Sequence, residues 1–164
     1  NGGDEDLGSI TVSNQVAGSG ADRNLAFRYT VQLKDQSGAP YTGTVSYSGS
    51  GAVAGGQNGL VRPDAEGRLA VTLAHGQSLK LTGSLTQDKG IVYSVVQAAQ
   101  EGYTVSTVLH DGTSDVPGTQ YAVNGKLDQG GVSNVSIAYT NTKQAGQSGG
   151  NTSAGQKPNP KTGA

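Results

Sequence analysis

The 164-residue sequence contains no cysteine, tryptophan or methionine, and it has no long hydrophobic run. Without cysteine the chain can form neither disulfide bonds nor thiolate metal sites, so an extracellular form must resist proteolysis and force by other means. Without about 20 consecutive apolar residues it has no segment that can cross a membrane as a helix. No signal peptide is present either, and we therefore expect a processed or excised fragment if the protein is secreted.

Charged side chains are also few, and the two signs nearly balance. The sequence has 11 basic and 12 acidic residues, which give a formal net charge of -1 at pH 7. Recognition of nucleic acid or of an anionic membrane surface rests on an excess of lysine and arginine. The composition therefore predicts no nucleic-acid partner and no binding to a charged membrane surface.

The sequence lacks any arrangement of residues that predicts catalysis or cofactor binding. Its two histidines, His75 and His110, have no nucleophile or metal ligand at a known motif spacing, and we interpret both as turn residues. The acidic run Asp4-Glu5-Asp6 lacks the alternating oxygen ligands of a known calcium loop. We expect no catalytic residue, no metal site and no cofactor, so the protein is not predicted to be an enzyme.

What the chain does contain favours β-structure. It has 27 glycines and seven tyrosines but only 33% hydrophobic residues, a composition that suits thin sheets joined by glycine-rich turns. Apolar and polar residues alternate with a period of two, and no segment has a sustained helical period. Eight or more short strands separated by turns predict an all-β sandwich. The expected strands cover residues 9–16, 25–34, 41–48, 60–62, 68–74, 78–82, 91–97, 103–109 and 132–143.

Three of the connections between these strands carry more specific expectations. The dipeptide Asn124-Gly125 predicts a type I′ turn in the last hairpin before the terminal strand. The turn at residues 75–77 joins its two strands either as a hairpin or as a corner between two sheets. Residues 49–67 form the longest irregular segment, and we expect this segment to be mobile.

Three amide side chains, Asn14, Gln97 and Asn141, fall on strand faces that are otherwise apolar. If the alternation gives the correct register, all three point inward. They must then hydrogen-bond to one another or to the backbone, since an unpaired buried amide costs about 1–3 kcal/mol. A register shifted by one residue would instead turn them toward solvent.

The sequence divides into a lead-in, a folded domain and a tail. Residues 1–6 are polar and acidic and are expected to link to a preceding region, while residues 7–143 carry the predicted strands. Residues 144–164 are rich in glycine, serine, glutamine, asparagine, threonine and proline. Because this tail cannot bury enough apolar surface to offset the entropy of ordering, we expect a disordered linker.

The tail ends with Asn159-Pro160-Lys161-Thr162-Gly163, which resembles the sorting motif of Gram-positive surface proteins. In that motif a sortase cleaves between threonine and glycine and joins the threonine to an amine of the cell wall or of a pilin. Asn159 stands where the commonest form has leucine, although asparagine-proline variants belong to some sortase classes. The resemblance implies a secreted protein anchored to the cell wall of a Gram-positive bacterium, with sortase and either peptidoglycan or a neighbouring pilin as partners. The other interpretation is a solvated linker without this role.

Five segments also occur in an order typical of one known family: ITVSNQV, FRYTVQL, LAHGQSLKLTG, YSVVQAAQEGYTVST and AYTNTK. In this order they resemble the pilin isopeptide-linkage domains, which are Cna B-type, immunoglobulin-like sandwiches of sortase-anchored pilins and surface adhesins. In that family a lysine on the first strand is joined to an asparagine on the last, with a glutamate from a middle strand beside them. The resemblance places Asn141 at the asparagine position, but Asn14 at the lysine position and Gln97 at the glutamate position.

The two substituted positions lack the groups on which that linkage depends. In a dry core, burial lowers the pKa of a lysine and raises the pKa of a glutamate, so a neutral amine can attack the carboxamide while a neutral acid transfers protons. Asn14 has no basic lone pair, and Gln97 cannot titrate. We therefore predict that this domain has no isopeptide bond at the family position.

Together these features predict a structural surface or pilin module that spaces or displays other domains. The alternative is a ligand-binding adhesin domain for a host partner, with the loops at residues 49–67 and 110–118 forming its rim. A glycan or matrix-protein binder of that kind is expected to expose aromatic side chains in these loops, and the two loops contain none.

Overall fold

The computed structural model describes residues 6–85, 90–111, 115–118, 121–128 and 132–146. Its ordered elements are β-strands, and no helix in this part of the chain is long and apolar enough to cross a membrane. The start of the acidic lead-in, the tail from residue 147 and the sorting motif at 159–163 lie outside the described residues. The strands are β1 (Asp6–Ala17), β2 (Phe27–Asp35), β3 (Val45–Gly49), β4 (Ala52–Val53), β5 (Leu60–Val61), β6 (Arg68–Leu73), β7 (Ser78–Leu85), β8 (Ile91–Gln97), β9 (Thr104–His110), β10 (Asp115–Gly118), β11 (Ala122–Leu127) and β12 (Asn134–Thr142).

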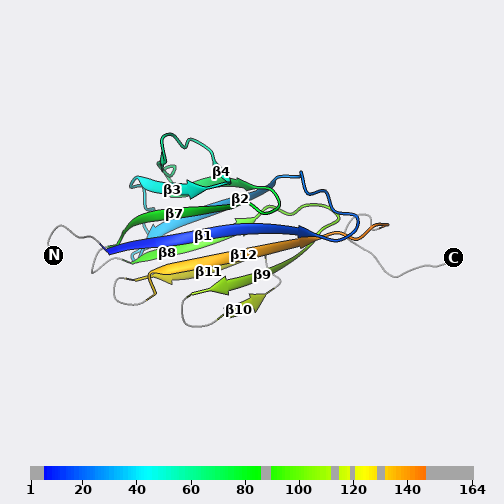
Figure 1. Ribbon diagram of the computed structural model, residues 1–164. Helices are drawn as coiled ribbons and strands as arrows, with labels where there is room; N and C mark the ends of the chain where they lie inside the picture. Colours follow the sequence, from blue (N-terminus) through cyan, green and yellow to red (C-terminus); the bar gives the residue numbers. More distant parts are fainter. Residues whose placement is uncertain (1–5, 86–89, 112–114, 119–120, 129–131, 147–164) are drawn as a thin grey trace.

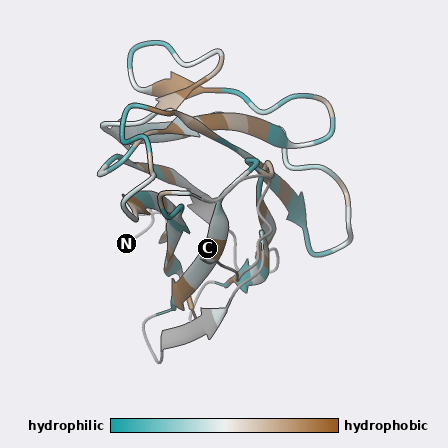
Figure 2. Cartoon of the chain, turned by 90° about the vertical axis from the view of Figure 1, so that its right-hand side faces the viewer, coloured by the Kyte–Doolittle hydropathy of each residue, from teal (hydrophilic) through white to brown (hydrophobic). Residues whose placement is uncertain are grey.

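The strands form two sheets that pack against each other (Figure 1). A seven-stranded sheet has the order β10-β9-β12-β1-β7-β3-β5, and a five-stranded sheet has the order β11-β8-β2-β6-β4. Figure 2 shows hydrophobic and hydrophilic residues interspersed along the strands of both sheets, as expected when one face of each sheet is buried. The predicted all-β sandwich is confirmed.

The core lies between the sheets and consists of the inward-facing residues of both. Along β2, buried positions alternate with more exposed ones, as the sequence pattern predicts. Two edge-to-face aromatic pairs cross the core, Phe27 with Tyr103 at 5.2 Å and Tyr29 with Tyr139 at 5.0 Å between ring centroids. Such pairs contribute about 0.5–1.5 kcal/mol beyond the area that they bury. They tie β2 of one sheet to β12 and to the residue before β9 in the other.

The first and last strands, β1 and β12, lie side by side near the middle of the seven-stranded sheet and run in the same direction. Their register runs from Ser9 opposite Asn134 to Ala17 opposite Thr142. In Figure 1, β1 starts at one end of the sandwich and β12 finishes at the other. The chain therefore enters and leaves the domain at opposite poles.

The connection between β6 and β7 is a corner between the two sheets, because β6 belongs to the five-stranded sheet and β7 to the seven-stranded one. The corner is attached to β1 by three hydrogen bonds. The Val16 N–H donates to His75 Nδ1 over 2.9 Å, the Gly76 N–H donates to the Asn14 carbonyl over 2.8 Å, and the Asn14 N–H donates to the Gln77 carbonyl over 3.1 Å. His75 therefore has a structural role in a turn.

The predicted type I′ turn at Asn124-Gly125 is wrong. Both residues lie inside β11, where Asn124 pairs with Ser94 and Gly125 with Tyr93 of β8. A Cβ atom at Gly125 would overlap the Tyr93 side chain. This glycine therefore allows an aromatic ring to approach the backbone of the strand closely.

The strand predicted at residues 41–48 is also partly wrong, because β3 begins only at Val45. Tyr41, which lies before β3, is hydrogen-bonded to the opposite sheet, because its N–H donates to the Leu33 carbonyl of β2 over 2.9 Å. The segment at 49–67 contains the predicted short strand β5 and the unpredicted β4. These two strands belong to different sheets, β4 pairing with β6 and β5 with β3.

The loop after β1 packs against the chain that follows β12. The Gly20 N–H donates to the Lys143 carbonyl, and the Lys143 N–H donates to the Ala17 carbonyl, both over 3.0 Å. Gly18 has a φ of 101°, and a Cβ atom there would overlap the Lys143 carbonyl oxygen. Glycine is required at this position by backbone conformation and by space.

We expect Gly18→Ala to lower the free energy of unfolding by about 2 kcal/mol or more, because it adds a steric clash to an unfavourable φ. Gly38→Ala is the matched control. Gly38 has a φ of 93° but open space around its Cβ position, so its substitution measures the backbone cost alone. Urea unfolding of both variants gives the difference, and equal losses would show that the contact with Lys143 contributes nothing.

Candidate functional site: a buried amide cluster

Asn14, Gln97 and Asn141 meet in the core, and we call this group the amide cluster. Asn14 lies on β1 and Asn141 on the adjacent β12, while Gln97 ends β8 in the opposite sheet. Their exposed fractions are 0%, 2% and 0%. The inward orientation predicted by the alternation is confirmed, and the register shifted by one residue is excluded.

The three side chains form a continuous set of hydrogen bonds. Gln97 Nε2 donates to Asn141 Oδ1 over 2.7 Å, and Asn141 Nδ2 donates back to Gln97 Oε1 over 2.8 Å. Asn141 Nδ2 also donates to Asn14 Oδ1 over 2.9 Å, and Asn14 Nδ2 donates to the Leu73 carbonyl of β6 over 3.1 Å. The bonds run from β8 through β12 and β1 to β6, so they link the two sheets twice.

Burial explains both the pairing and the chemistry of the cluster. A buried amide without a hydrogen-bond partner lowers the free energy of unfolding by about 1–3 kcal/mol, and each of these hydrogen bonds avoids that loss. Among the described residues no lysine, aspartate or glutamate is buried. This part of the core therefore offers no amine for nucleophilic attack and no acid for proton transfer. The cluster can hold strands together, but it has no group that titrates near neutral pH.

Two buried tyrosines adjoin the cluster. The Tyr139 hydroxyl donates toward the carbonyls of Tyr121 and Val95, at 2.8 and 3.2 Å. Burial is the main cause that raises the pKa of Tyr29 and of Tyr139. The neighbouring Asn141 amide offsets part of the rise in the pKa of Tyr29, yet the Tyr29 hydroxyl makes no hydrogen bond of regular geometry. Sequence alternation predicted that both rings face inward, but it gave no sign of these contacts.

This difference predicts opposite effects of removing the two hydroxyl groups. Tyr139→Phe should lower the free energy of unfolding by about 1–2 kcal/mol, because it removes a donor from buried carbonyls. Tyr29→Phe should leave the stability unchanged or raise it by up to about 1 kcal/mol, because it removes a buried hydroxyl without a regular partner. Both variants keep the ring pair, so denaturant unfolding compares the hydroxyls alone. A larger loss for Tyr29→Phe would contradict this account.

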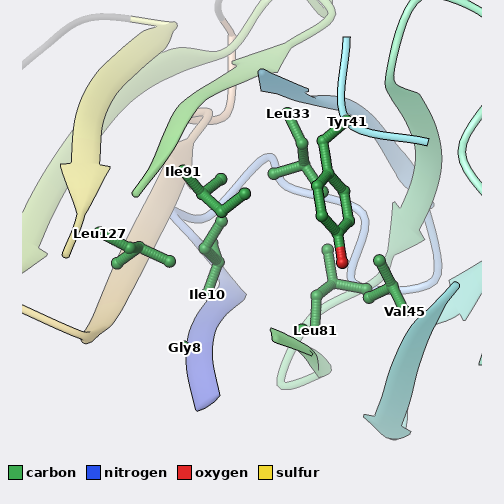
Figure 3. Close-up of a pocket in the computed structure, with 9 residues that line it drawn as sticks. Gly8, Ile10, Leu33, Tyr41, Val45, Leu81, Ile91 and Leu127 are labelled. Atoms are coloured by element: carbon green, nitrogen blue, oxygen red, sulfur yellow. The ribbon is translucent and has the colours of Figure 1, made fainter. Parts of the chain in front are cut away.

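A separate apolar recess lies between the sheets near the start of β1 (Figure 3). Its accessible volume of about 20 Å³ is close to that of a single water molecule, and polar partners for a water are scarce in its lining. It is therefore a packing gap without room for a ligand. Its lining is formed by Gly8, Ile10, Leu33, Tyr41, Val45, Leu81, Gly83, Ile91 and Leu127.

The two loops considered as a binding rim do not meet. The segment at 49–67 contributes β5 at one edge of the seven-stranded sheet, and β10, from the segment at 110–118, lies at the other edge. Five strands separate them. A single rim built from both loops is therefore wrong. In the described segments there is also no group of three acidic, histidine or cysteine side chains that could hold a metal ion.

Solved structures share this architecture. The major pilin of Streptococcus pyogenes matches with a TM-score of 0.66 at 22% identity, over 85% of this chain and 48% of the pilin. Its T3.2 counterpart matches with a TM-score of 0.63 at 21% identity, over 84% and 45%. The pilus-presented adhesin Cpa matches with a TM-score of 0.60 at 23% identity, over 83% and 27%. These similarities show the fold: the domain is a two-sheet β-sandwich like those in the pilin and pilus-adhesin structures.

The family follows from the sequence. Residues 8–143 match a family described as a domain of unknown function, DUF7601, and the chain belongs to that family. No curated protein matches the chain. The chain spans about half the length of the major pilin structures that it matches.

Proposed function

We propose that this domain is a structural module of a Gram-positive surface protein or pilus, in which the amide cluster joins the strands without an isopeptide bond. The observation that carries the proposal is the position of the cluster. Asn141 stands where the resembling family has its reactive asparagine, and Asn14 and Gln97 stand where the family has lysine and glutamate. The three side chains are buried and in contact. The arrangement of the linkage is thus kept, while two of its reactive groups are replaced by neutral amides.

The lysines of the described segments support the absence of the bond. Lys34 and Lys80 lie on outward faces of β2 and β7, and Lys126 lies on β11 outside the core. Lys143 follows β12, and its Nζ stands 5.7 Å from the centroid of the Tyr103 ring. None of these four amines is among the buried residues.

The path of the chain supports a spacer role. We propose residues 7–143 as the stalk domain, with residues 1–6 and 144–164 as connections to its neighbours. Because β1 starts at one pole and β12 ends at the other (Figure 1), such domains are suited to arrangement in series. The pilin and adhesin folds of its structural neighbours favour an extracellular position on the cell surface. Neither the spacer role nor the surface position requires catalysis by this domain.

The proposed anchor is the motif Asn159-Pro160-Lys161-Thr162-Gly163, with sortase, cell-wall peptidoglycan or a neighbouring pilin as partners. We expect a sortase that accepts asparagine-proline motifs to cleave after Thr162 and to form a thioester with the released domain. Thr162→Ala should abolish this reaction and leave the far-ultraviolet circular dichroism unchanged. Thr152→Ala in the same tail is the control and should react normally. If the sortase accepts a control peptide but never this tail, anchoring by this motif is wrong.

A further inference from the structure

A surface hollow of about 360 Å³ lies at the edge of the five-stranded sheet, where β4 leaves β6. This volume falls near the lower end of the range of about 300–1,000 Å³ that is typical of small-ligand sites. The hollow does not include any residue of the amide cluster. Its lining combines small side chains with charged ones: Thr30, Ala54, Arg62, Asp64, Arg68, Leu69 and Ala70.

The path of the chain explains why this hollow exists. Just after β4, the Ala54 N–H donates to the Ala70 carbonyl of β6 over 2.9 Å. The chain then departs to form β5 in the other sheet and returns at Asp64, whose N–H donates to the Arg68 carbonyl over 3.0 Å. No described strand covers the edge of β6 between these two bonds. The interrupted pairing leaves an opening on the sheet.

The floor of the hollow is built from small residues. Ala54 lies opposite Ala70, and Thr30 of β2 pairs with Ala70 on its other side. All three residues are exposed. Two methyl groups and one threonine side chain thus form a row across three strands. Such a surface fits the C–H face of a ring, with one hydroxyl beside it.

Two arginines provide the positive charge of the hollow. Arg62 donates from Nε to the Thr42 carbonyl over 3.3 Å, and its two terminal nitrogens make no hydrogen bond or ion pair with a described residue. Arg68 lies 3.7 Å from the Glu66 carboxylate, and both side chains are about half exposed, so this ion pair is weak. Both guanidinium groups can therefore turn toward a ligand. Their planar donor arrangement matches a carboxylate better than a lysine would.

Asp64 supplies an acceptor next to the two cations. Its Oδ1 accepts hydrogen bonds from the backbone N–H groups of Glu66 and Arg68, each over 2.9 Å. These hydrogen bonds, first that from Arg68, hold the pKa of Asp64 below its usual value, so the group is a carboxylate at neutral pH. No described residue donates to Oδ2. This second oxygen can accept a hydrogen bond from a ligand hydroxyl.

We propose that the hollow binds a carboxylate-bearing sugar of an acidic glycan, such as a uronic or sialic acid residue. The sugar carboxylate pairs with Arg62 and Arg68, a ring hydroxyl donates to Asp64 Oδ2, and the ring lies on the alanine floor beside Thr30. This arrangement replaces the aromatic stacking that neutral sugars favour, which the segment at 49–67 cannot provide because it has no aromatic residue.

Other ligand classes fit the hollow less well. Nucleic acid requires an extended basic surface and stacking rings, whereas this hollow has two arginines and no aromatic side chain. An apolar peptide anchor requires a deep hydrophobic pocket, whereas the charged groups here are exposed. A simple anion would use the arginines but would leave Asp64 and the floor without a role. The carboxylated sugar uses all of these groups.

The test is an NMR titration of the folded domain with glucuronic acid and N-acetylneuraminic acid. Glucose, which has the ring without the charge, and acetate, which has the charge without the ring, are the control ligands. We expect saturable shifts at the backbone amides of Thr30, Ala54 and Ala70 with at least one acidic sugar. Arg62→Gln and Arg68→Gln should each weaken the affinity about tenfold, as expected for a lost charge-assisted hydrogen bond. Arg28→Gln is the control, because Arg28 lies on the outer face of β2 but does not line the hollow.

Three results would overturn this assignment. One is the absence of saturable shifts at these amides with both acidic sugars. Another is an equal loss of affinity in Arg28→Gln, which would show non-specific attraction to a basic face. The third is binding of acetate as tight as binding of the sugars, which would leave a simple anion as the ligand. Because the substituted arginines are exposed, an unchanged spectrum outside the hollow verifies that each variant is folded.

Discussion

Replacing Asn14 with lysine and Gln97 with glutamate together should create a spontaneous isopeptide bond to Asn141. The product should be lighter than its calculated mass by one ammonia. In this reaction the introduced amine attacks the side-chain carbonyl carbon of Asn141, a new amide bond forms, and the former amide nitrogen leaves as ammonia. The introduced glutamate, kept neutral by burial, transfers the protons. Intact mass spectrometry of the purified variant measures the loss.

The geometry for this reaction is already present in the protein. Asn14 Oδ1 lies 2.9 Å from Asn141 Nδ2, and Gln97 Nε2 lies 2.7 Å from Asn141 Oδ1. A lysine at position 14 and a glutamate at position 97 therefore start beside the carboxamide with which they must react. Dry surroundings favour the neutral forms that the reaction needs. The closed loop would span 127 residues, and the chain-entropy relation for cross-links gives a stabilisation of about 4–5 kcal/mol.

The single substitutions should have the opposite effect. Asn14→Lys alone or Gln97→Glu alone places an ionisable group in the core without its partner, and we expect a loss of about 3–5 kcal/mol in the free energy of unfolding. Adding Asn141→Ala to the double variant is the control that cannot react, and it should keep its full mass. A folded double variant that retains its ammonia would show that the three positions are not equivalent to those of the bonded family.

The second large effect is expected when the domain is stretched between its ends. Force on the start of β1 and the end of β12 pulls these parallel neighbours in opposite directions along their length. All the register pairs between Ser9–Asn134 and Ala17–Thr142 then resist at the same time. If, as we propose, no isopeptide bond joins β1 to β12, the strands should still separate, at a rate governed by the unfolding barrier. We expect one cooperative unfolding event that releases the whole domain.

Single-molecule force spectroscopy of tandem copies distinguishes the protein from its double variant. In the variant, the bond between positions 14 and 141 would keep the 127-residue stretch of chain between them from being pulled out. When unfolded, that stretch adds roughly 430 Å of length at about 3.4 Å per residue. The unaltered domain should show the long extension, and the variant should lack it. A short extension in the unaltered domain would mean that a covalent link already joins the first and last strands.

Sequence alternation predicted the burial of the three amides, because the orientation of a strand residue depends only on a period of two. Asn14 and Asn141 occupy inward positions in runs whose other inward residues are apolar, so their burial follows from the register of a single strand. The contact between them depends on which strands are neighbours. No local pattern contains that information, and the family resemblance supplied it. The bond from Asn14 to the Leu73 carbonyl was missed because a backbone acceptor on another strand has no sequence signal.

The wrong predictions have a common physical cause, which is that tertiary contacts overrode local preference. Asn124-Gly125 is a strong turn signal, yet pairing with β8 and the ring of Tyr93 places it inside a strand. The hollow between β4 and Asp64 arises because one segment divides its pairing between two sheets. A polar, glycine-rich segment gives no warning of such a division. The sequence named the whole segment at 49–67 as a candidate rim, but it did not single out Arg62 and Asp64 within that segment.

The most direct test of the central claim is the intact mass of the unaltered protein, measured after denaturation. Asn14, Gln97 and Asn141 are hydrogen-bonded to one another, and we propose that no covalent bond joins them. We therefore expect the full calculated mass of the chain, with Asn14 and Asn141 recovered on separate peptides after digestion. A mass lower by one ammonia, together with a cross-linked peptide that contains Asn141, would contradict this proposal.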